Sequence, residues 1–255
     1  MCLIVLAYRI HPDYPLIVAA NRDEFYARPT QAAGFWAEHP DLLAGRDEQS
    51  GGTWLGITRS GRFAAVTNVR RGGMVNTGLR SRGQLVCDFL TGNANALAFS
   101  ETVARDAHHY GAFNLLTWDG DNLIAHHSLS NDSELLEPGI HGLSNDRLNT
   151  PWPKLTRSLN ALRACIDDNP SPEALFGVLR DTTRPADHEL PDTGIGLKQE
   201  QLLGSPFIRS ADYGTRACTV LRVHRSGRVD FHEQTFDAQG IQGAEVHETF
   251  SVPGD

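Results

Sequence analysis

The chain opens with MCLIVLAYRIHPDYPLIVAANRDE, residues 1–24, which joins two apolar runs to a dense polar cluster. The first run, Cys2 to Tyr8, and the second, Leu16 to Ala20, predict buried β-strands, with turn chemistry at His11-Pro12-Asp13 between them. Asn21-Arg22-Asp23-Glu24 then follows the second run directly. Three charges are unusual where a strand continues into a core, so the cluster is either the mouth of a site or a surface turn.

Hairpin signals return three more times along the chain. In each, a turn with Gly after Ser or Asp separates β-rich runs; the pairs are 54–57 with 63–68, 113–118 with 123–126, and 219–223 with 229–236. Helical spacing predicts helices at 81–90, 94–108, 153–166 and 172–179. Hairpins without βαβ crossovers indicate an α/β (α+β) protein with mostly antiparallel sheets, covered by a helical layer.

Two features concern the connections. Ser81-Arg82-Gly83-Gln84 has the form of a capping box at a helix start. Residues 181–211, rich in Pro, Gly and Asp, are predicted to form a long loop, either a functional lid or a disordered segment. No interdomain linker is evident, so we expect one domain over residues 1–255.

Composition argues against several classes of protein. Hydrophobic residues make up 40% of the 255 residues and charged residues 21%, a globular balance. A formal net charge of -8 argues against a nucleic-acid partner, because phosphate binding needs a surplus of Lys and Arg. One local cluster of basic residues is an exception to this acidic balance, and we interpret it as a solvated loop and helix start. It comprises Arg70, Arg71, Arg80 and Arg82. No apolar run approaches the ~20 residues that span a bilayer, so we expect no membrane span.

The cysteines and histidines indicate a cytoplasmic location without a metal site. The N-terminus lacks a secretory signal, and the cysteines contain no C-x-x-C pair that would suggest a disulfide framework or zinc site. A reducing cytoplasm is therefore expected. The pairs His108-His109 and His126-His127 do not chelate naturally, because adjacent strand residues point to opposite faces.

Cys2 is the first candidate for chemistry because of its position. Removal of Met1, normal before a small residue, leaves Cys2 with a thiol and a free α-amine on one carbon. The amine titrates near ~8 and the thiol near ~8.5, so the amine can act as a local base for the thiol. The alternative is that Cys2 is a small apolar residue at the start of a buried strand.

Three further polar residues and one aromatic residue could belong to a site. Asn68 and Asn145 end short strands, where an amide can donate to a developing oxyanion or simply form a turn. Arg216 precedes a strongly β-forming run and is either paired within a site or solvated at the strand edge. Trp54 could line an apolar pocket or belong to the core.

Several motifs occur in an order that resembles one family. They are Met1-Cys2, Asn21-Arg22-Asp23-Glu24, Gly51-Gly52-Thr53-Trp54-Leu55-Gly56, Thr67-Asn68, Phe113-Asn114-Leu115-Leu116, Gly142-Leu143-Ser144-Asn145, Thr150-Pro151-Trp152-Pro153-Lys154 and Tyr213-Gly214-Thr215-Arg216. From residue 1 to about residue 250, the chain resembles the NRDE family, which includes the eukaryotic transport-and-Golgi-organisation proteins of the second type. The eukaryotic members are linked to haem trafficking and to lipid and acyl-coenzyme A metabolism.

The family layout is similar to the N-terminal-nucleophile hydrolases of the choloylglycine hydrolase and penicillin acylase branch. This likeness implies a four-layer αββα sandwich and a processed N-terminal cysteine that cleaves amide bonds. It makes Cys2 the nucleophile and Asp23 the carboxylate that positions its amine. Asn68 and Asn145 become oxyanion donors, and Arg216 becomes the cation near the thiol.

The sequence departs from the hydrolase pattern in one place. That branch has an Arg followed three residues later by an Asp, whereas Arg22 and Asp23 are adjacent. If Asp23 faces the site, strand alternation turns Arg22 away and brings Asn21 alongside. Asn21, Arg22 and Glu24, together with Trp54, are the residues we expect to bind substrate.

Two functions remain open at this point. The first is an amidohydrolase or acyltransferase that acts on a small acyl amide through Cys2 and needs no cofactor. The second is a binding or trafficking protein for haem, an acyl chain or acyl-coenzyme A, with Cys2 as a ligand, a redox handle or a relic. An inactive scaffold is a third reading, and the pattern carries no signal for oligomeric state.

Overall fold

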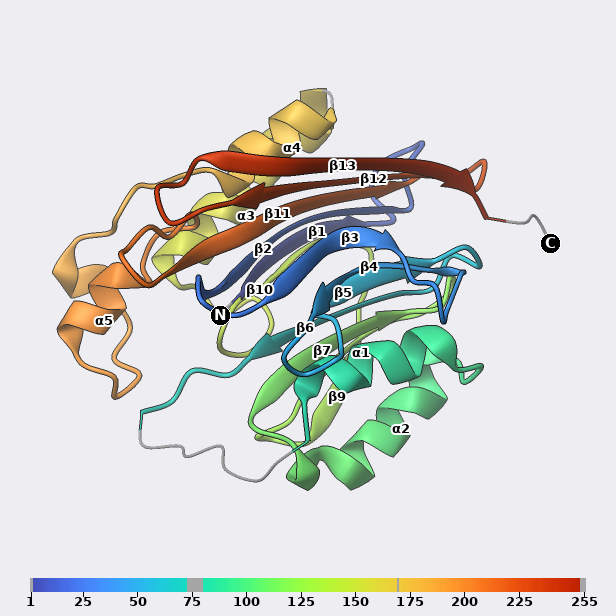
Figure 1. Cartoon of the computed structure of the whole chain (residues 1–255), viewed down its shortest axis with the longest axis horizontal. Helices are drawn as coiled ribbons and strands as arrows, with labels where there is room; N and C mark the ends of the chain where they lie inside the picture. Colours follow the sequence, from blue (N-terminus) through green and yellow to red (C-terminus); the bar gives the residue numbers. More distant parts are fainter. Residues whose placement is uncertain (1, 73–79, 169, 253–255) are drawn as a thin grey trace.

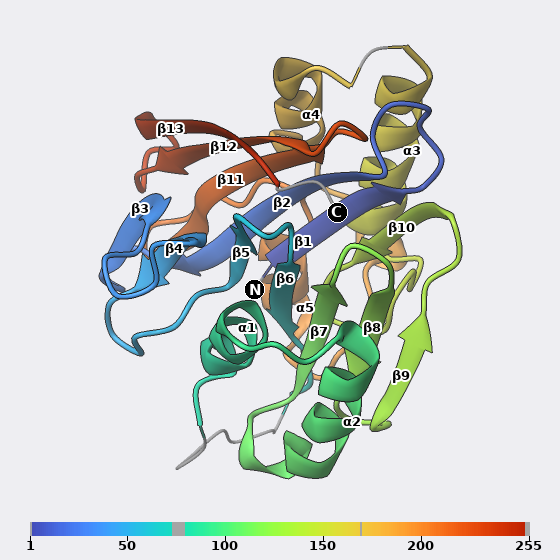
Figure 2. The same cartoon turned by 90° about the vertical axis from the view of Figure 1, so that its right-hand side faces the viewer.

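A computed structural model describes residues 2–72, 80–168 and 170–252. Met1, whose removal we predict, lies outside these residues. Two antiparallel β-sheets pack face to face, and helices cover both outer faces (Figures 1 and 2). The prediction of a four-layer αββα sandwich is therefore confirmed.

The first sheet is built around the N-terminal hairpin. In spatial order its strands are β10 (Gly139–Leu143), β1 (Cys2–Tyr8), β2 (Leu16–Phe25), β11 (Tyr213–Val223), β12 (Arg228–Phe236) and β13 (Gln242–Ser251). The second sheet follows chain order, with β3 (Thr30–Phe35), β4 (Leu42–Asp47), β5 (Leu55–Thr58), β6 (Phe63–Asn68), β7 (Phe113–Trp118), β8 (Leu123–His127) and β9 (Asp132–Leu135). Strands far apart in sequence thus flank β1 and β2, which lie inside the first sheet.

The outer layers are short helices. They are α1 (Arg82–Thr91) and α2 (Ala96–Asp106) on the second sheet, and α3 (Pro153–Asp168) and α4 (Pro172–Leu179) on the first (Figure 2). The short α5 (Leu197–Leu202) and two single-turn 3-10 helices, η1 (Ala107–His109) and η2 (Asp187–Glu189), complete the described elements. No helix among the described residues is long and apolar enough to cross a membrane.

Alternation along β1 explains the layering. Ile4 and Leu6 point toward the second sheet and join the core between the sheets, whereas Leu3 and Val5 point toward α3 and α4. Because both faces are covered, β1 reads as a continuous apolar run instead of an alternating one. At about 25 cal/mol per Å² of buried apolar surface, such a doubly buried strand contributes strongly to stability.

The predicted strands and helices are present, and the differences have simple causes. The strand that begins at Leu16 continues through the polar cluster to Phe25. Strands β3, β4, β9 and β13 were not anticipated. The residues of β3, β9 and β13 are largely exposed or polar and lack a strong β pattern, and β4 is a short run without a hairpin turn signal. The segment predicted as a long loop, 181–211, contains η2 and α5.

The start of α1 differs from the predicted capping box. Ser81 occupies the N-cap position, but its side chain makes no capping hydrogen bond, and Gln84 donates to Asp88 at 2.8 Å instead. The helix start is held by close backbone packing: a Cβ on Gly52 would lie 2.6 Å from the Gly83 carbonyl carbon. Glycine at position 52 therefore lets the start of α1 approach the loop before β5.

Candidate active site

The hairpin places Cys2 opposite the polar cluster. In the β1–β2 register Cys2 pairs with Arg22, so both side chains lie on the same side of the sheet. Asp23 lies one position further along β2 and pairs with Thr215 of β11. The chemistry-bearing residues thus meet where β1 begins.

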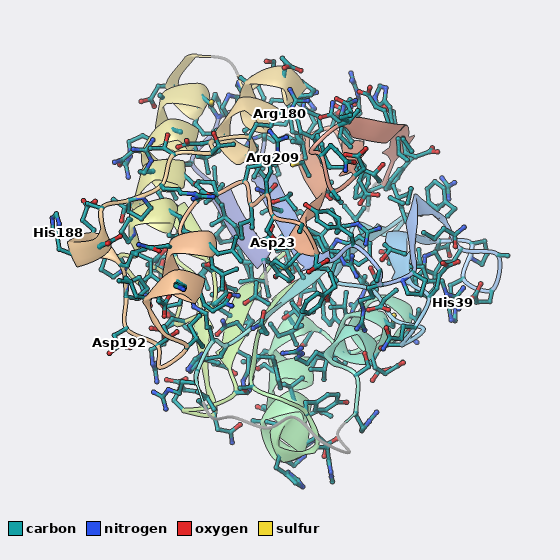
Figure 3. The ribbon with its side chains drawn as sticks, turned by 60° about the vertical axis from the view of Figure 1, so that its left-hand side comes forward. Asp23, His39, Arg180, His188, Asp192 and Arg209 are labelled. Carbon is teal, nitrogen blue, oxygen red and sulfur yellow. The ribbon has the colours of Figure 1, made fainter. Side chains whose placement is uncertain are left out.

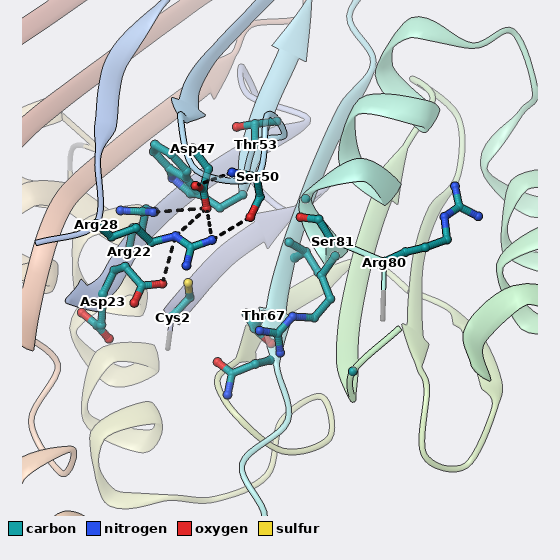
Figure 4. A pocket seen from close by; sticks show the side chains of 17 residues that line it. Cys2, Arg22, Asp23, Arg28, Asp47, Ser50, Thr53, Thr67, Arg80 and Ser81 are labelled. Carbon is teal, nitrogen blue, oxygen red and sulfur yellow. Dashed lines mark hydrogen bonds and ion pairs between the residues drawn. The ribbon is translucent and has the colours of Figure 1, made fainter. Parts of the chain in front are cut away.

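A cavity of about 260 Å³ opens at this point (Figure 4). Its walls come from the ends of β1, β2 and β6, the loop before β5, and the start of α1. The lining residues are Cys2, Arg22, Asp23, Glu24, Arg28, Asp47, Ser50, Thr53, Trp54, Val66, Thr67, Asn68, Arg80, Ser81, Arg82, Gly83 and Gly111. The pocket is therefore polar, with a single thiol among these side chains.

The arginine that lies near the thiol, where Arg216 was expected, is Arg22. Its side chain is only 4% exposed, lies 3.8 Å from the Asp47 carboxylate, and stacks 4.3 Å from the centroid of the Trp54 ring. Alternation holds, but it places Arg22 on the side of the sheet that carries the thiol, so the expectation that Arg22 is turned away from the site is wrong. The pocket wraps around the end of β1, so side chains from both faces of β2 reach it.

Asp23 lies in the interior of the molecule, whereas His39 and His188 project from the periphery (Figure 3). Its carboxylate accepts a hydrogen bond of 2.7 Å from the Thr215 hydroxyl. Burial raises the pKa of Asp23, and the positive charge of Lys154 and the hydrogen bond from Thr215 oppose this shift. The carboxylate therefore lies within an electrostatic network that includes Lys154 of α3.

The Cys2 thiol is kept neutral by its surroundings. Burial raises the pKa of the thiol, although the positive charge of Arg22 acts in the opposite direction. A neutral thiol attacks poorly, so a nucleophilic Cys2 needs a base within reach. After removal of Met1, its own α-amine is such a base.

The two asparagines are joined to each other. The Asn145 side-chain amide donates to the Asn68 backbone carbonyl at 3.1 Å and to the Asn68 side-chain carbonyl at 3.2 Å. Asn68 lines the pocket, whereas Asn145 is fully buried behind it. Asn145, expected as a second oxyanion donor, therefore directs its amide to Asn68 and does not line the pocket.

Arg216 does not line this pocket. A β-bulge between Thr215 and Ala217 inserts it as the extra residue, and its guanidinium donates to the carbonyls of Phe25, Tyr26 and Arg28 at 3.0–3.1 Å. The side chain thus supports the turn after β2. The structure places Arg22, and not Arg216, beside the thiol.

The expected substrate-binding residues divide into two groups. Glu24 and Trp54 line the pocket together with Arg22. Asn21 lies elsewhere: its amide donates to the carbonyls of Leu179 and Pro206, both at 2.9 Å, on the helical side of the sheet. Asn21 therefore joins elements and does not reach the pocket, contrary to the prediction.

Two arginines that we expected to be solvated, Arg70 and Arg82, instead contact groups inside the molecule. Arg70 is 7% exposed and forms an ion pair of 2.9 Å with the buried Glu200 of α5. Arg82 lines the Cys2 pocket and donates to the Ala112 carbonyl at 3.2 Å. The sequence showed that they cluster, but only the fold shows that they are turned inward.

Lys154 is the main residue that sequence reasoning missed. It is 2% exposed on α3, and its Nζ has no hydrogen-bond partner among the described residues. Burial lowers the pKa of Lys154 to about 8, while the negative charges of Asp23 and Cys2 oppose the shift. The available signal was a lysine next to Leu155 at the start of an amphipathic helix.

Other kinds of site find less support. No group of His, Cys, Asp and Glu side chains within the described ranges could hold a metal ion. No His lines the described part of the Cys2 pocket, so the thiol has no imidazole partner there. The arrangement of thiol, carboxylate, amide donor and guanidinium instead suits acyl-transfer chemistry.

The fold is that of N-terminal-nucleophile hydrolases. A solved mutant of the conjugated bile acid hydrolase from Clostridium perfringens matches with a TM-score of 0.50. The match covers 98% of this chain and 92% of that one, at 8% sequence identity. At this identity the likeness shows the shared fold alone.

Within that fold class, the family is defined by sequence. The family model for Transport and Golgi organisation 2 matches residues 1–238. A Transport and Golgi organization protein 2 homolog from Bos taurus is 35% identical over 92% of this chain and 93% of its own, and the Homo sapiens homolog is 34% identical over the same shares. The chain belongs to the Transport and Golgi organisation 2 family.

Proposed function

We propose that the protein is an amidohydrolase or acyltransferase that uses Cys2 as an N-terminal nucleophile on a small acyl amide. The observation that carries the proposal is the convergence of Cys2, Arg22, Asp23 and Asn68 on one cavity. These residues supply a nucleophile, a counter-charge, an amine-positioning carboxylate and an amide donor. Burying charges costs free energy that packing alone does not recover, which supports a role in function.

The first half-reaction forms a thioester. The α-amine of processed Cys2 takes the thiol proton as sulfur attacks the carbonyl carbon and a new C–S bond forms. The Asn68 amide donates to the oxygen that becomes negatively charged, and Arg22 stabilises the developing negative charge near sulfur. The C–N bond then breaks, and the ammonium of Cys2 returns its proton to the leaving nitrogen.

The second half-reaction releases the acyl group. Water, or an acceptor amine in the transferase case, loses a proton to the α-amine as it attacks the thioester carbonyl. The C–S bond breaks and the thiol is restored with that proton. The products are a carboxylic acid, or a new amide, and a free enzyme.

The experiment follows the acyl group directly. We would incubate purified protein with a panel of N-acyl amides, measure amine release, and determine the intact mass of the protein during turnover. The proposal predicts an acyl adduct mapped to Cys2, with activity lost in Cys2→Ser and Cys2→Ala. Cys165→Ala, which removes another partly buried cysteine, serves as the matched control and should retain activity.

Two results would refute the proposal. One is amine release that continues in Cys2→Ala, which would place the chemistry elsewhere. The other is a pocket that binds the panel compounds without forming an adduct or releasing amine, which would favour a binding protein.

A further inference from the structure

The lining of the Cys2 pocket is rich in cations. Four arginines line the cavity, Arg22, Arg28, Arg80 and Arg82, against the three carboxylates Asp23, Glu24 and Asp47. Among the lining residues the arginines exceed the carboxylates by one, and Asp88, which does not line the cavity, lies 3.9 Å from Arg80. A buried surplus charge is costly unless a ligand or neighbouring group compensates it.

Three of these arginines lie within 4.0 Å of a carboxylate. Arg28 lies 2.8 Å from Asp47 and 3.9 Å from Glu24, Arg80 lies 3.9 Å from Asp88, and Arg22 lies 3.8 Å from Asp47. Because Arg28 contacts Asp47 more closely than Arg22 does, Arg22 and Arg82, which pairs with no carboxylate among the described residues, are the two with capacity for a ligand.

Arg22 has an unused donor inside the pocket. Its side chain is 4% exposed, its contact with Asp47 is a 3.8 Å ion pair and not a hydrogen bond, and its Nη1 has no hydrogen-bond partner among the described residues. Figure 4 shows the Arg22 guanidinium beside Asp47, next to the Arg28 guanidinium that contacts Asp47 and Ser50. A nearly buried N–H group without an acceptor indicates a place where an anionic oxygen would bind.

Arg82 lines the same cavity, but from the start of α1 and not from β2. It is the first residue of α1, and within the described chain it forms no ion pair within 4.0 Å. Arg82 and Cys2 line the same cavity; burial lowers the pKa of the Arg82 guanidinium, and negative charge at Cys2 and Glu24 opposes the shift. The first turn of α1 contains no acidic residue, which leaves its partial positive charge uncompensated as well.

We propose that the substrate of this site carries a single negative charge, of the carboxylate type, that binds between Arg82 at the start of α1 and Arg22. The guanidinium fork and the helix terminus both favour a planar anion with two acceptor oxygens. The cavity of about 260 Å³ limits the part of the substrate that enters it to a small group. The proposal rests on the proposed function for the bond that is cleaved, but anion binding itself does not depend on cleavage.

The first test compares two alkylating reagents of nearly equal size, iodoacetate and iodoacetamide. Only iodoacetate carries the carboxylate, so the ratio of its rate to that of iodoacetamide at Cys2 measures anion recognition. In Arg82→Gln we expect the iodoacetate rate to fall about tenfold, with little change for iodoacetamide, since a charge-assisted hydrogen bond is lost. Arg105→Gln removes an exposed arginine of α2 and serves as the charge-matched control.

Equal slowing of both reagents in Arg82→Gln would overturn the proposal, because Arg82 would then act only on the thiol. An unchanged rate ratio would overturn it as well. These outcomes are distinct from failure of the proposed hydrolase, since alkylation requires no amide cleavage.

The second test removes the reactive thiol. In Cys2→Ser, calorimetry would compare benzoylglycine with its neutral amide, benzoylglycinamide. We expect the carboxylate to bind at least about tenfold more tightly, and Arg82→Gln to erase the difference. Equal affinities would overturn the proposal, and displacement by inorganic phosphate but not by acetate would replace the carboxylate with a phosphate ligand.

Discussion

The two ends of the β1–β2 hairpin have the same backbone pairing but opposite side-chain chemistry. Toward the turn, Leu6 pairs with Val18 and both are at most 1% exposed within the apolar core. At the open end, Cys2 pairs with Arg22, and Asp23 beside it is also buried. Burial stabilises the first end, whereas it imposes a desolvation cost at the second. This difference is what the proposed function predicts, because a reactive site needs polar groups that an apolar core excludes.

The largest expected effect tests the turn end. Leu6→Ala leaves a cavity in the core between the sheets, so we expect the free energy of unfolding to fall by about 4 kcal/mol in urea denaturation. The rate of Cys2 alkylation should stay at the wild-type value under native conditions. A large loss of alkylation rate in the folded variant would mean that the two ends are not independent.

The next effect concerns a buried acid on β12, near the open end. Glu233 accepts hydrogen bonds from the Ala33 amide at 2.7 Å and the Thr219 hydroxyl at 3.3 Å, and burial raises its pKa from 4.5 to about 7. Because the folded pKa is raised, its contribution to stability is complete below pH 4.5 and is lost as pH rises through about 7.

Glu233→Gln should remove that pH dependence. At pH 8 the variant is expected to be more stable than wild type by about 3 kcal/mol, while at pH 4 the two should be similar. Urea denaturation at both pH values measures the difference. If Glu233→Gln is destabilising at pH 8, the carboxylate contributes to stability and the contrast between the two ends is weaker than we infer.

Asn68→Ala tests the oxyanion role at the open end. Loss of one oxyanion donor typically costs about 3 kcal/mol in the barrier, so kcat should fall about a hundredfold with little change in the unfolding free energy. Asn145→Ala should act through Asn68, since its amide donates to that residue, and have a smaller effect. Turnover of Asn68→Ala within a few-fold of wild type would remove the residue from the mechanism.

The smallest effect concerns Lys154. The positive charge of Lys154 stabilises the ionised forms of Asp23 and Cys2. Lys154→Met should therefore raise the pKa of the thiol and slow alkylation at pH 7 about tenfold. The pH profile of iodoacetamide alkylation would show this as a shift to higher pH. Lys198→Met, at the chain's other lysine, on α5, is the control. A parallel profile for Lys154→Met and wild type would contradict an electrostatic role.

The sequence was informative where structure follows from local pattern. The apolar run from Cys2, the turn glycines and the helical spacing of Leu155, Leu159 and Leu162 predicted most elements. The motif order predicted the family and the fold. Both kinds of inference depend on residues that are neighbours in the chain.

The rest of the site depends on contacts between distant segments. The bulge that turns Arg216 away becomes visible only when β11 is paired with β2. Arg82 and Lys154 reach the open end of the hairpin from two helices in opposite layers. Alternation holds at Arg22, but only the β1–β2 register shows that the thiol lies on the Arg22 face, with Asp23 reaching the pocket from the other face of β2.

The measurement that tests the central claim most directly is the intact mass of the purified protein before and after iodoacetamide treatment at neutral pH. The account predicts a mass without Met1 and rapid addition of one carbamidomethyl group, mapped to Cys2 and faster than at Cys165. A mass that retains Met1, or a Cys2 no more reactive than Cys165, would contradict the claim that Cys2 is an activated N-terminal nucleophile.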